Sequence, residues 1–253
     1  MSQPWEIYDA LLDGLPDDVV VRTAGQGPRW SRVLNSAGGV GTAWTMDVRS
    51  RPALSGDGPL DGRALRDVGA LAKSWNLAEA SIGQAAINSW YSREQTAAAN
   101  GFKPTGEGLT WRQVFDPYQE MIAGKRVAVI GHFPFAEAAL AGAGEYICLE
   151  RNLQPGDWPD SACEYILPEC DVVFISSSSF VNKTAPRLIE LSRQAHTVLV
   201  GPSTPLNPVL LDYGVDTVTG FIAARSLSDP AALAELVPAG DIGPGFRVHR
   251  HRV

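Results

Sequence analysis

The chain has 253 residues, 45% hydrophobic and 19% charged, which is typical of a globular protein with one large or two modest domains. Its formal net charge of -7 argues against a nonspecific nucleic-acid binder, which needs a basic face. No apolar run is long enough to span a bilayer, and the first six residues lack the basic and apolar regions of a signal peptide. We therefore expect a cytoplasmic protein without membrane or nucleic-acid partners.

Three cysteines, Cys148, Cys163 and Cys170, stand in or beside apolar segments. An odd, sparse set argues against a disulfide framework, and the three lack the close pair spacing of zinc sites. Cys148 falls in the centre of a predicted strand, where cysteine packs as a small hydrophobic residue. We interpret all three as buried thiols.

The first half of the chain predicts a helix over residues 5–15 and a strand meander over 19–24, 30–35 and 40–46. Two further helices are predicted over 61–74 and 76–100. Gly83 lies inside the second, where glycine costs about 1 kcal/mol relative to alanine, so we expect a close approach by another backbone or a ligand. Asn88 is polar within an apolar turn, and by local sequence it is either a surface amide or a satisfied one.

After a predicted helix over 110–123, strands alternate with helices. Apolar, β-branched runs at 126–130, 146–150, 171–176 and 197–201 are typical of buried parallel strands, with helices predicted over 135–143, 161–167 and 185–194. This alternation indicates an α/β fold with a parallel sheet, and we place a domain boundary between residues 123 and 124. Residues 239–253 are expected to be a mobile surface end, whose two histidines are either metal ligands or simply solvated.

Ligands of parallel sheets bind beyond the carboxyl ends of the strands, where this sequence has four polar or Gly/Pro-rich turns. The first, Gly131-His132-Phe133-Pro134, lacks the later glycines of a dinucleotide-binding fingerprint. His132 is there either a ligand, a general acid or base, or a structural donor.

Two acidic residues belong to the second turn. Glu150 ends its strand at the position where an acidic side chain can bind ribose hydroxyls, although Arg151 offers it a surface partner instead. Asp160 is explained as a helix cap, whereas Asp157 has no evident capping role and is the better site candidate.

The third and fourth turns carry hydroxyl groups. Residues 176–179 are four serines, followed by Asn182, and they suit either an anion or a turn capped by Thr184. Residues 201–208 contain three prolines, which give the loop one shape and present Ser203 and Thr204 in fixed positions.

The ordered series of motifs resembles the family called "putative heavy-metal chelation" proteins. The motifs are Gly-His-Phe-Pro at 131–134, Pro-Gly-Asp-Trp-Pro-Asp at 155–160, Leu-Pro-Glu-Cys-Asp-Val-Val at 167–173, Val-Asn-Lys-Thr at 181–184, Gly-Pro-Ser-Thr-Pro at 201–205 and Ala-Ser-Ile-Gly-Gln-Ala-Ala-Ile-Asn at 80–88. The four serines at 176–179 depart from the Thr-Gly-Thr-like residues of relatives.

The resemblance implies a C-terminal Rossmann-like domain at 124–253, an N-terminal α+β domain at 1–123 similar to the enolase N-terminal fold, and a site between them. It makes Asn88 a ligand candidate. The resulting hypothesis has His132 and Asp157 as catalytic residues and His132, Glu150 and Asp157 as metal ligands. The predicted ligand-binding residues are Asn88, Gly131, Phe133, Pro134, Glu150, Ser177, Ser178, Asn182, Pro202, Ser203 and Thr204.

Three functions stay open on this basis. The first is binding or conversion of a metal-chelating or anionic small molecule at the domain interface, and the second is non-catalytic binding of a divalent metal or metal complex. The third is a nucleotide or S-adenosylmethionine site that uses Glu150, against which the missing glycine fingerprint counts. Seven tryptophans also lead us to expect self-association, with a homodimer as the candidate assembly.

Overall fold

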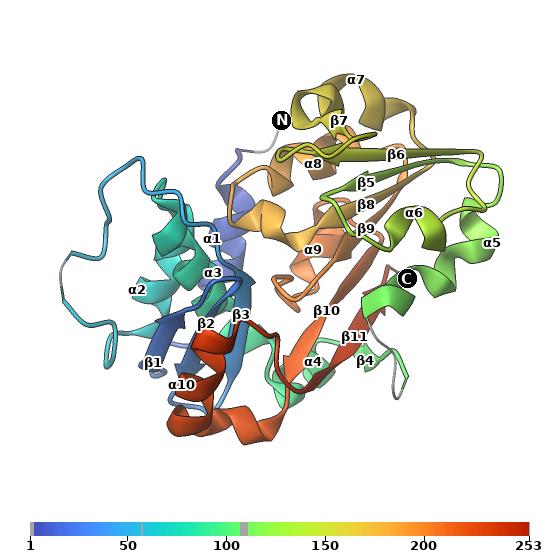
Figure 1. The fold of residues 1–253 in the computed structure, drawn as a ribbon. Coiled ribbons are helices and arrows are strands. Elements are labelled where there is room, and N and C mark those ends of the chain that lie inside the picture. Colours follow the sequence, from blue (N-terminus) through green and yellow to red (C-terminus); the bar gives the residue numbers. More distant parts are fainter. Residues whose placement is uncertain (1–2, 57, 107–110, 253) are drawn as a thin grey trace.

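The computed structural model describes residues 3–56, 58–106 and 111–252 as a mixed α/β fold with two sheets (Figure 1). The small sheet is antiparallel with the order β1-β2-β3, and the large sheet has the order β4-β11-β10-β9-β8-β5-β6-β7. Neighbours from β10 to β7 are parallel, whereas β11 runs antiparallel to β10 and β4. The predicted α/β class, with a Rossmann-like sheet beside an N-terminal α+β unit, is confirmed.

The N-terminal half forms the predicted helix and meander. Its elements are α1 (Glu6–Asp13), β1 (Val21–Gln26), β2 (Trp30–Asn35), β3 (Val40–Trp44), α2 (Leu65–Ala70), the 3₁₀ helix η1 (Leu71–Lys73), α3 (Leu77–Tyr91) and α4 (Glu94–Ala99). The single helix predicted over 76–100 is wrong, because Arg93 has extended backbone angles (φ -69°, ψ 133°) that separate α3 from α4.

The remaining elements build the large sheet and its covering helices. They are β4 (Lys103–Pro104), η2 (Trp111–Tyr118), α5 (Gln119–Ile122), β5 (Arg126–Ile130), α6 (Ala136–Ala139), β6 (Glu145–Glu150), β7 (Trp158–Pro159), η3 (Asp160–Ala162), α7 (Cys163–Ile166), η4 (Leu167–Glu169), β8 (Val172–Ser176), η5 (Ser177–Phe180), α8 (Ala185–Leu191), β9 (His196–Val200), α9 (Val209–Asp212), β10 (Thr217–Ala223), η6 (Arg225–Ser228), α10 (Pro230–Ala239) and β11 (Gly245–His251).

Two predictions in this half are corrected. The helix predicted over 110–123 is a 3₁₀ segment, η2, that contains Pro117 and passes into the short α5; residue 110 lies outside the described residues. Proline lacks the N–H that an α-helix needs, which accounts for the irregular start. The tail over 239–253 is not a mobile end, because β11 pairs with β10 along its length; residue 253 is outside the described residues.

Both faces of the central strands of the large sheet are buried. One face packs under η2, α5 and α6, with Phe115, Phe174 and Ile122 at its centre. The other packs against α7, α8 and α9 and is continuous with the N-terminal core, so one apolar cluster contains both Ile7 of α1 and Ile175 of β8. This double cover explains why the strands are continuous apolar runs.

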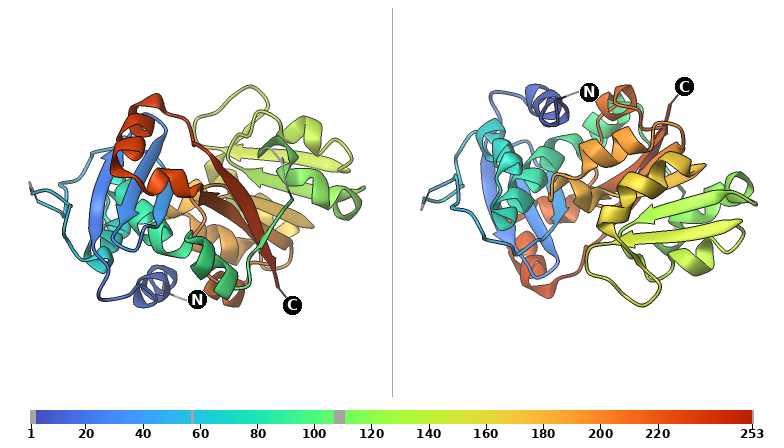
Figure 2. Two further views of the ribbon diagram at one scale, coloured as in Figure 1. Left: turned by 90° about the horizontal axis from the view of Figure 1, so that it is seen from below. Right: turned by 90° about the horizontal axis from the view of Figure 1, so that it is seen from above.

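The small sheet lies between α3 and α10 (Figure 2). Helix α10 comes from the end of the chain, yet Leu233 packs with Leu34 of β2 and Val40 of β3. The two ends of the chain are thus joined in one structure. Among the described residues, no helix is long and apolar enough to cross a membrane.

Candidate functional site

The predicted turns lie along one edge of the large sheet, because β9, β8, β5 and β6 are successive parallel neighbours. Gly131 follows β5 with φ +98°, and a Cβ there would stand 2.9 Å from Cβ of Ser176. Gly201 follows β9 with φ +130°, and its Cβ would stand 2.7 Å from Oγ of Ser177. The serine run after β8 therefore sits between two turns in which glycine is required.

Three side chains with metal-ligating atoms meet at the β5–β6 end of this edge. The ligand atoms of His132, Cys148 and Asp157 all lie within 4.8 Å of one another. His132 Nδ1 is 3.1 Å from both carboxylate oxygens of Asp157 and 3.9 Å from Cys148 Sγ. A tetrahedral zinc-type shell requires ligand separations of roughly 3.3–3.8 Å, so small adjustments would bring the three groups around one ion.

The cluster is reached from solvent through the imidazole. The His132 side chain is 27% exposed, whereas the Asp157 side chain is 4% exposed and Cys148 is buried. The geometry assigns Nδ1–H of His132 as a donor to the Asp157 carboxylate, which also accepts from the backbone N–H of Gln154 at 2.9 Å. Asp157 therefore has a turn-capping contact that its sequence did not reveal.

Electrostatics separate the acid from the thiol. Burial opposes ionisation of Asp157, but hydrogen bonds from Gln154, Cys148 and His132 outweigh it and hold the pKa of this carboxyl below its ordinary value. Burial, together with the adjacent Asp157, raises the pKa of Cys148 to about 12. The thiol is thus protonated at neutral pH. A metal ion would bind by replacing the thiol proton, and His132 would offer the Nδ1 lone pair by carrying its ring proton on Nε2 instead.

Cys148 is the member of the cluster that sequence reasoning did not select. It stands two residues before Glu150 in β6, so strand alternation places both side chains on one face of the sheet. Its partner in β5 is Val129, three residues before His132. The register between β5 and β6 would have predicted that Cys148 lies near His132. That register can be assigned only when the two strands are known to be neighbours.

Glu150 lies beside the cluster and binds backbone groups. Its Oε2 accepts from the N–H of His132 at 2.8 Å, and its Oε1 accepts from the N–H groups of Arg151 and Asn152 at 2.6 and 2.9 Å. The carboxylate therefore fixes the turn that carries His132. The salt-bridge partner of Arg151 is Asp160, at 2.8 Å, and not Glu150.

A second group of predicted residues is buried between the two sheets. Nδ2 of Asn88 donates to the carbonyl oxygens of Thr42 and Ser203 at 2.8 and 2.9 Å. Oγ of Ser203 accepts from the N–H of Trp44 at 2.8 Å, and Thr204 donates its hydroxyl to Thr219 O at 2.9 Å. Asn88, Ser203 and Thr204 are all buried. The contacts of Asn88 and Ser203 join α3 and β3 to the loop after β9, and the contact of Thr204 joins that loop to β10.

The other candidates on the edge have local partners. Asn182 Oδ1 accepts from the N–H and hydroxyl of Thr184 at 3.1 and 2.6 Å. Ser178 and Ser176 share a hydroxyl contact of 2.9 Å, while Ser177 is buried. Polar groups are therefore present here, but most of them order the turn before α8.

The apolar candidates differ in exposure. Phe133 packs edge-on against Phe115, with ring centroids 6.0 Å apart, whereas Pro134 is exposed. Pro202 is half-buried beside Gly201. Phe133 thus anchors the turn of His132 to the helical layer over the sheet.

Lys183 is a further residue that the sequence did not single out. It is the one described non-glycine residue with positive φ, at 67°. Its Nζ donates to Val181 O at 2.8 Å and lies 5.8 Å from the ring centroid of Trp75 in the N-terminal half. Burial lowers the pKa of Lys183 to about 8, and Glu79 opposes the shift.

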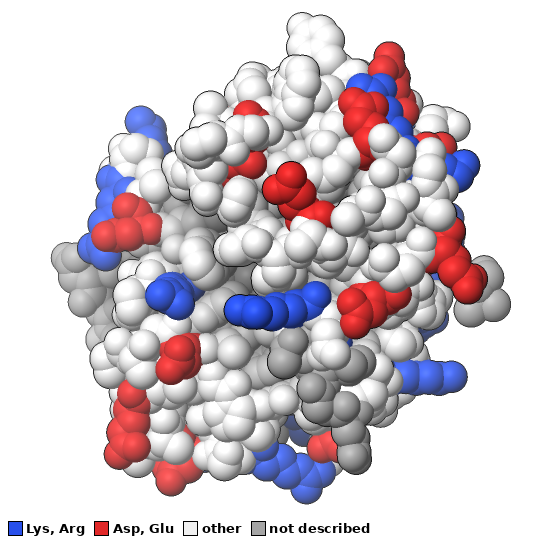
Figure 3. All heavy atoms as spheres, turned by 45° about the vertical axis from the view of Figure 1, so that its right-hand side comes forward, with Lys and Arg blue, Asp and Glu red and all other residues white. Residues whose placement is uncertain are grey.

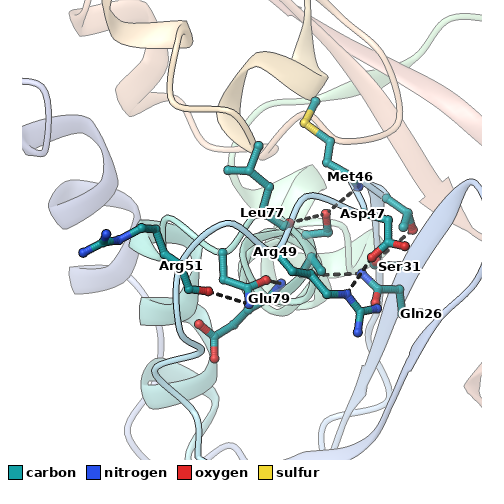
Figure 4. A network of polar contacts seen from close by, with 12 residues as sticks. Gln26, Ser31, Met46, Asp47, Arg49, Arg51, Leu77 and Glu79 are labelled. Carbon is teal, nitrogen blue, oxygen red and sulfur yellow. Dashed lines mark hydrogen bonds and ion pairs between the residues drawn. The ribbon is translucent and has the colours of Figure 1, made fainter.

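A hollow of about 220 Å³ is lined by residues of the N-terminal half. Polar contacts hold the loop that passes over the start of α3 (Figure 4). The Glu79 carboxylate accepts from the N–H groups of Leu54 and Ser55 at 2.8 and 2.7 Å. Asn76 donates to the carbonyl of Arg51 at 3.1 Å, which fixes the loop at a second point. None of the predicted site residues lines this hollow.

Basic and acidic side chains are mixed on the face shown in Figure 3. On the side of the molecule that carries α5 and α6, basic and acidic side chains are interspersed among the described residues (Figure 3). Arg126, for example, pairs with Glu145 at 3.0 Å and with Glu169 at 2.5 Å.

Two family models, both described as "Putative heavy-metal chelation", match residues 8–91 and 113–246. The crystal structure of a DUF364-family protein from Desulfitobacterium hafniense DCB-2 is 37% identical, with 98% of each chain covered and a TM-score of 0.85. The chain belongs to this family. No curated protein matches it.

The DUF364-family structure from Pyrococcus horikoshii is 22% identical, covers 98% of this chain and 99% of its own, and has a TM-score of 0.78. At that identity the likeness shows the fold alone. The description of the family names heavy-metal chelation. The side chains of His132, Cys148 and Asp157 offer nitrogen, sulfur and oxygen donors, which are chemically suited to a metal ion.

Proposed function

We propose that this protein binds a divalent transition metal, free or as a small complex, through His132, Cys148 and Asp157. The observation that carries the proposal is the convergence of a thiol, an imidazole and a carboxylate within 4.8 Å. Sulfur and imidazole ligands favour zinc, nickel, cobalt or copper over magnesium and calcium, which prefer oxygen.

Three protein ligands leave at least one coordination position open in a tetrahedral shell. The 27% exposure of the His132 side chain supports access to that position from solvent. An exogenous ligand, such as an anionic chelator, would then complete the shell from the solvent side. The proton-transfer role predicted for His132 and Asp157 belongs instead to the alternative in which these side chains are not bound to a metal.

Backbone contacts around the cluster support a prearranged site. Glu150 fixes the turn of His132, and the N–H of Gln154 orients Asp157. Outer contacts of this kind hold ligands in place and tune their basicity. Asn88, Ser203 and Thr204 form their contacts elsewhere, so the metal proposal does not depend on them.

The test is a cobalt(II) titration of chelator-treated protein, followed by calorimetry and near-ultraviolet absorption. Wild-type protein should show a thiolate-to-cobalt charge-transfer band, and Cys148→Ser should remove it. We expect His132→Ala and Asp157→Asn to weaken binding by more than the roughly 10–100-fold that loss of an outer-shell partner costs.

Cys163→Ser is the matched control, because Cys163 is also buried with a pKa raised by burial to about 12 but lies outside the cluster. It should leave the titration unchanged, and circular dichroism should show that each variant folds. A wild-type titration without a charge-transfer band, or equal binding by folded Cys148→Ser, would disprove the metal site.

A further inference from the structure

Three of the four histidines in the chain, His196, His249 and His251, gather at the opposite end of the large sheet. They come from β9 and β11, which flank β10. The fourth, His132, belongs to the proposed metal site beyond β5. The histidine row, as we call His196, His249 and His251, has no part in that site.

The strand register places the histidine row on one face. In the antiparallel ladder, His251 is opposite Thr217 and His249 is opposite Thr219. Directly opposed residues point to the same side of a sheet. Thr217 is also level with Val198 of β9, and alternation puts His196 on that side two residues earlier.

Contacts between the side chains confirm this arrangement. Thr217 Oγ1 is 2.9 Å from His251 Nδ1 and 3.4 Å from His196 Nε2. The rings of His249 and His251 have centroids 4.7 Å apart, inclined by 45°. One hydroxyl thus links His196 and His251, and the ring of His249 lies beside that of His251 in a tilted contact.

The tautomers leave a nitrogen available. A hydroxyl has one proton, so Thr217 donates to one imidazole and accepts from the N–H of the other. If it accepts Nδ1–H of His251, the shorter contact, Nε2 of His251 carries a free lone pair. Metal-binding histidines are commonly held in this way, with one ring nitrogen fixed by a neighbour and the other on the metal.

The exposure of His249 and His251 and the charges around them determine which metal ions they can bind. His251 is exposed and His249 half-buried, so the pair faces solvent. Lys103 is opposite His249 in the ladder. Arg247, two residues before His249, has its guanidinium 5.8 Å from the ring centroid of Trp111. Positive neighbours disfavour ions held by charge alone, whereas neutral imidazoles bind nickel, copper and zinc through their lone pairs.

We propose that His249 and His251 form a second, solvent-facing chelate for a borderline divalent metal such as nickel or copper. Thr217 and His196 are positioning residues that hold the ring of His251. This site is independent of His132, Cys148 and Asp157, and it lies on the strand that the sequence alone predicted to be a mobile end.

The experiment is a nickel(II) titration of the full chain without an affinity tag, read by calorimetry and by the histidine resonances in paramagnetic NMR. Nickel should broaden the resonances of His249 and His251 in wild-type protein and in Cys148→Ser. The double variant His249→Gln, His251→Gln should lose this binding event and keep the charge-transfer band of the first site with cobalt. Thr217→Val should weaken it by about 10-fold, the effect of losing an outer-shell partner.

The matched control is Arg252→Gln, a change on the same segment outside the histidine row. It should leave the titration unchanged. In the Cys148→Ser background, equal nickel affinity after the His249→Gln, His251→Gln change, or broadening confined to His132, would overturn the second site. Because the cobalt and nickel readouts use different residues, either site can fail without the other.

Discussion

At the scale of single residues, burial and local donors decide the chemistry. Asp157 is ionised because hydrogen bonds outweigh its burial, while Cys148, in contact with that charge, keeps its proton. A bound metal ion would stabilise the thiolate of Cys148 and so favour loss of its proton. The ionised carboxylate of Asp157 and the protonated thiol of Cys148 therefore lie side by side.

The pKa of Cys148, raised to about 12, predicts how metal binding depends on pH. Over the neutral range the thiol is protonated, so each bound ion releases its proton. Raising the pH should strengthen binding by about tenfold per unit from this proton alone. Calorimetry in buffers of different ionisation enthalpy measures the released proton, and a flat pH profile would show that the thiol is not a ligand.

At the scale of elements, small residues set the distance between helices and sheets. A Cβ on Gly83 of α3 would stand 2.0 Å from the backbone nitrogen of Ala72, and one on Gly41 of β3 would stand 1.9 Å from Ala85 O. The close approach predicted at Gly83 is thus confirmed, and the neighbour is backbone. Helix α3 is fixed on both sides by contacts that no larger side chain permits.

Gly83→Ala should therefore destabilise the protein. The gain of about 1 kcal/mol in helix propensity is smaller than the overpacking cost, typically 1–3 kcal/mol and more against backbone. Urea denaturation measures the difference. Gly142→Ala is the control, because nothing lies within 4 Å of a Cβ there, and it should be nearly neutral. A stabilised Gly83→Ala would refute the packing argument.

At the scale of the whole molecule, buried polar contacts connect the two sheets. Tyr8 of α1 donates its hydroxyl to Phe180 O at 2.7 Å, and Asn88 of α3 donates to Ser203 O at 2.9 Å. The apolar cluster that holds both Ile7 and Ile175 is continuous across the same boundary. We expect the N- and C-terminal parts to unfold together, with coincident tryptophan-fluorescence and circular-dichroism transitions.

Asn88→Ala tests this coupling. It removes a donor from the buried carbonyls of Thr42 and Ser203, and Ser203 O keeps only the longer contact from Gln84 Nε2 at 3.3 Å. An unsatisfied buried acceptor costs about 1–3 kcal/mol. Chemical denaturation should show the loss, with metal affinity unchanged. The exposed Asn152→Ala is the control and should shift stability by less than about 0.5 kcal/mol. Normal stability with weakened ligand binding would instead support the ligand role predicted for Asn88.

Local pattern was sufficient for much of the fold. The strands of the meander and of β5, β6, β8 and β9 follow from apolar runs between turn residues, and the edge on which the turns gather follows from their parallel order. It was insufficient for β11, whose residues alternate apolar with basic and histidine side chains and look like a polar tail. Pairing with β10 makes that segment a strand, and such pairing is a long-range property.

The sequence by itself determined the α/β class, the turns at the strand ends and the choice of His132 and Asp157 as site candidates, because periodicity and turn chemistry act over a few residues. Only the tertiary structure brought Cys148 to His132, buried Asn88 against Ser203 and set His251 beside Thr217. These contacts join residues from different elements, and their geometry depends on strand register and on how the two sheets pack, which no local pattern encodes.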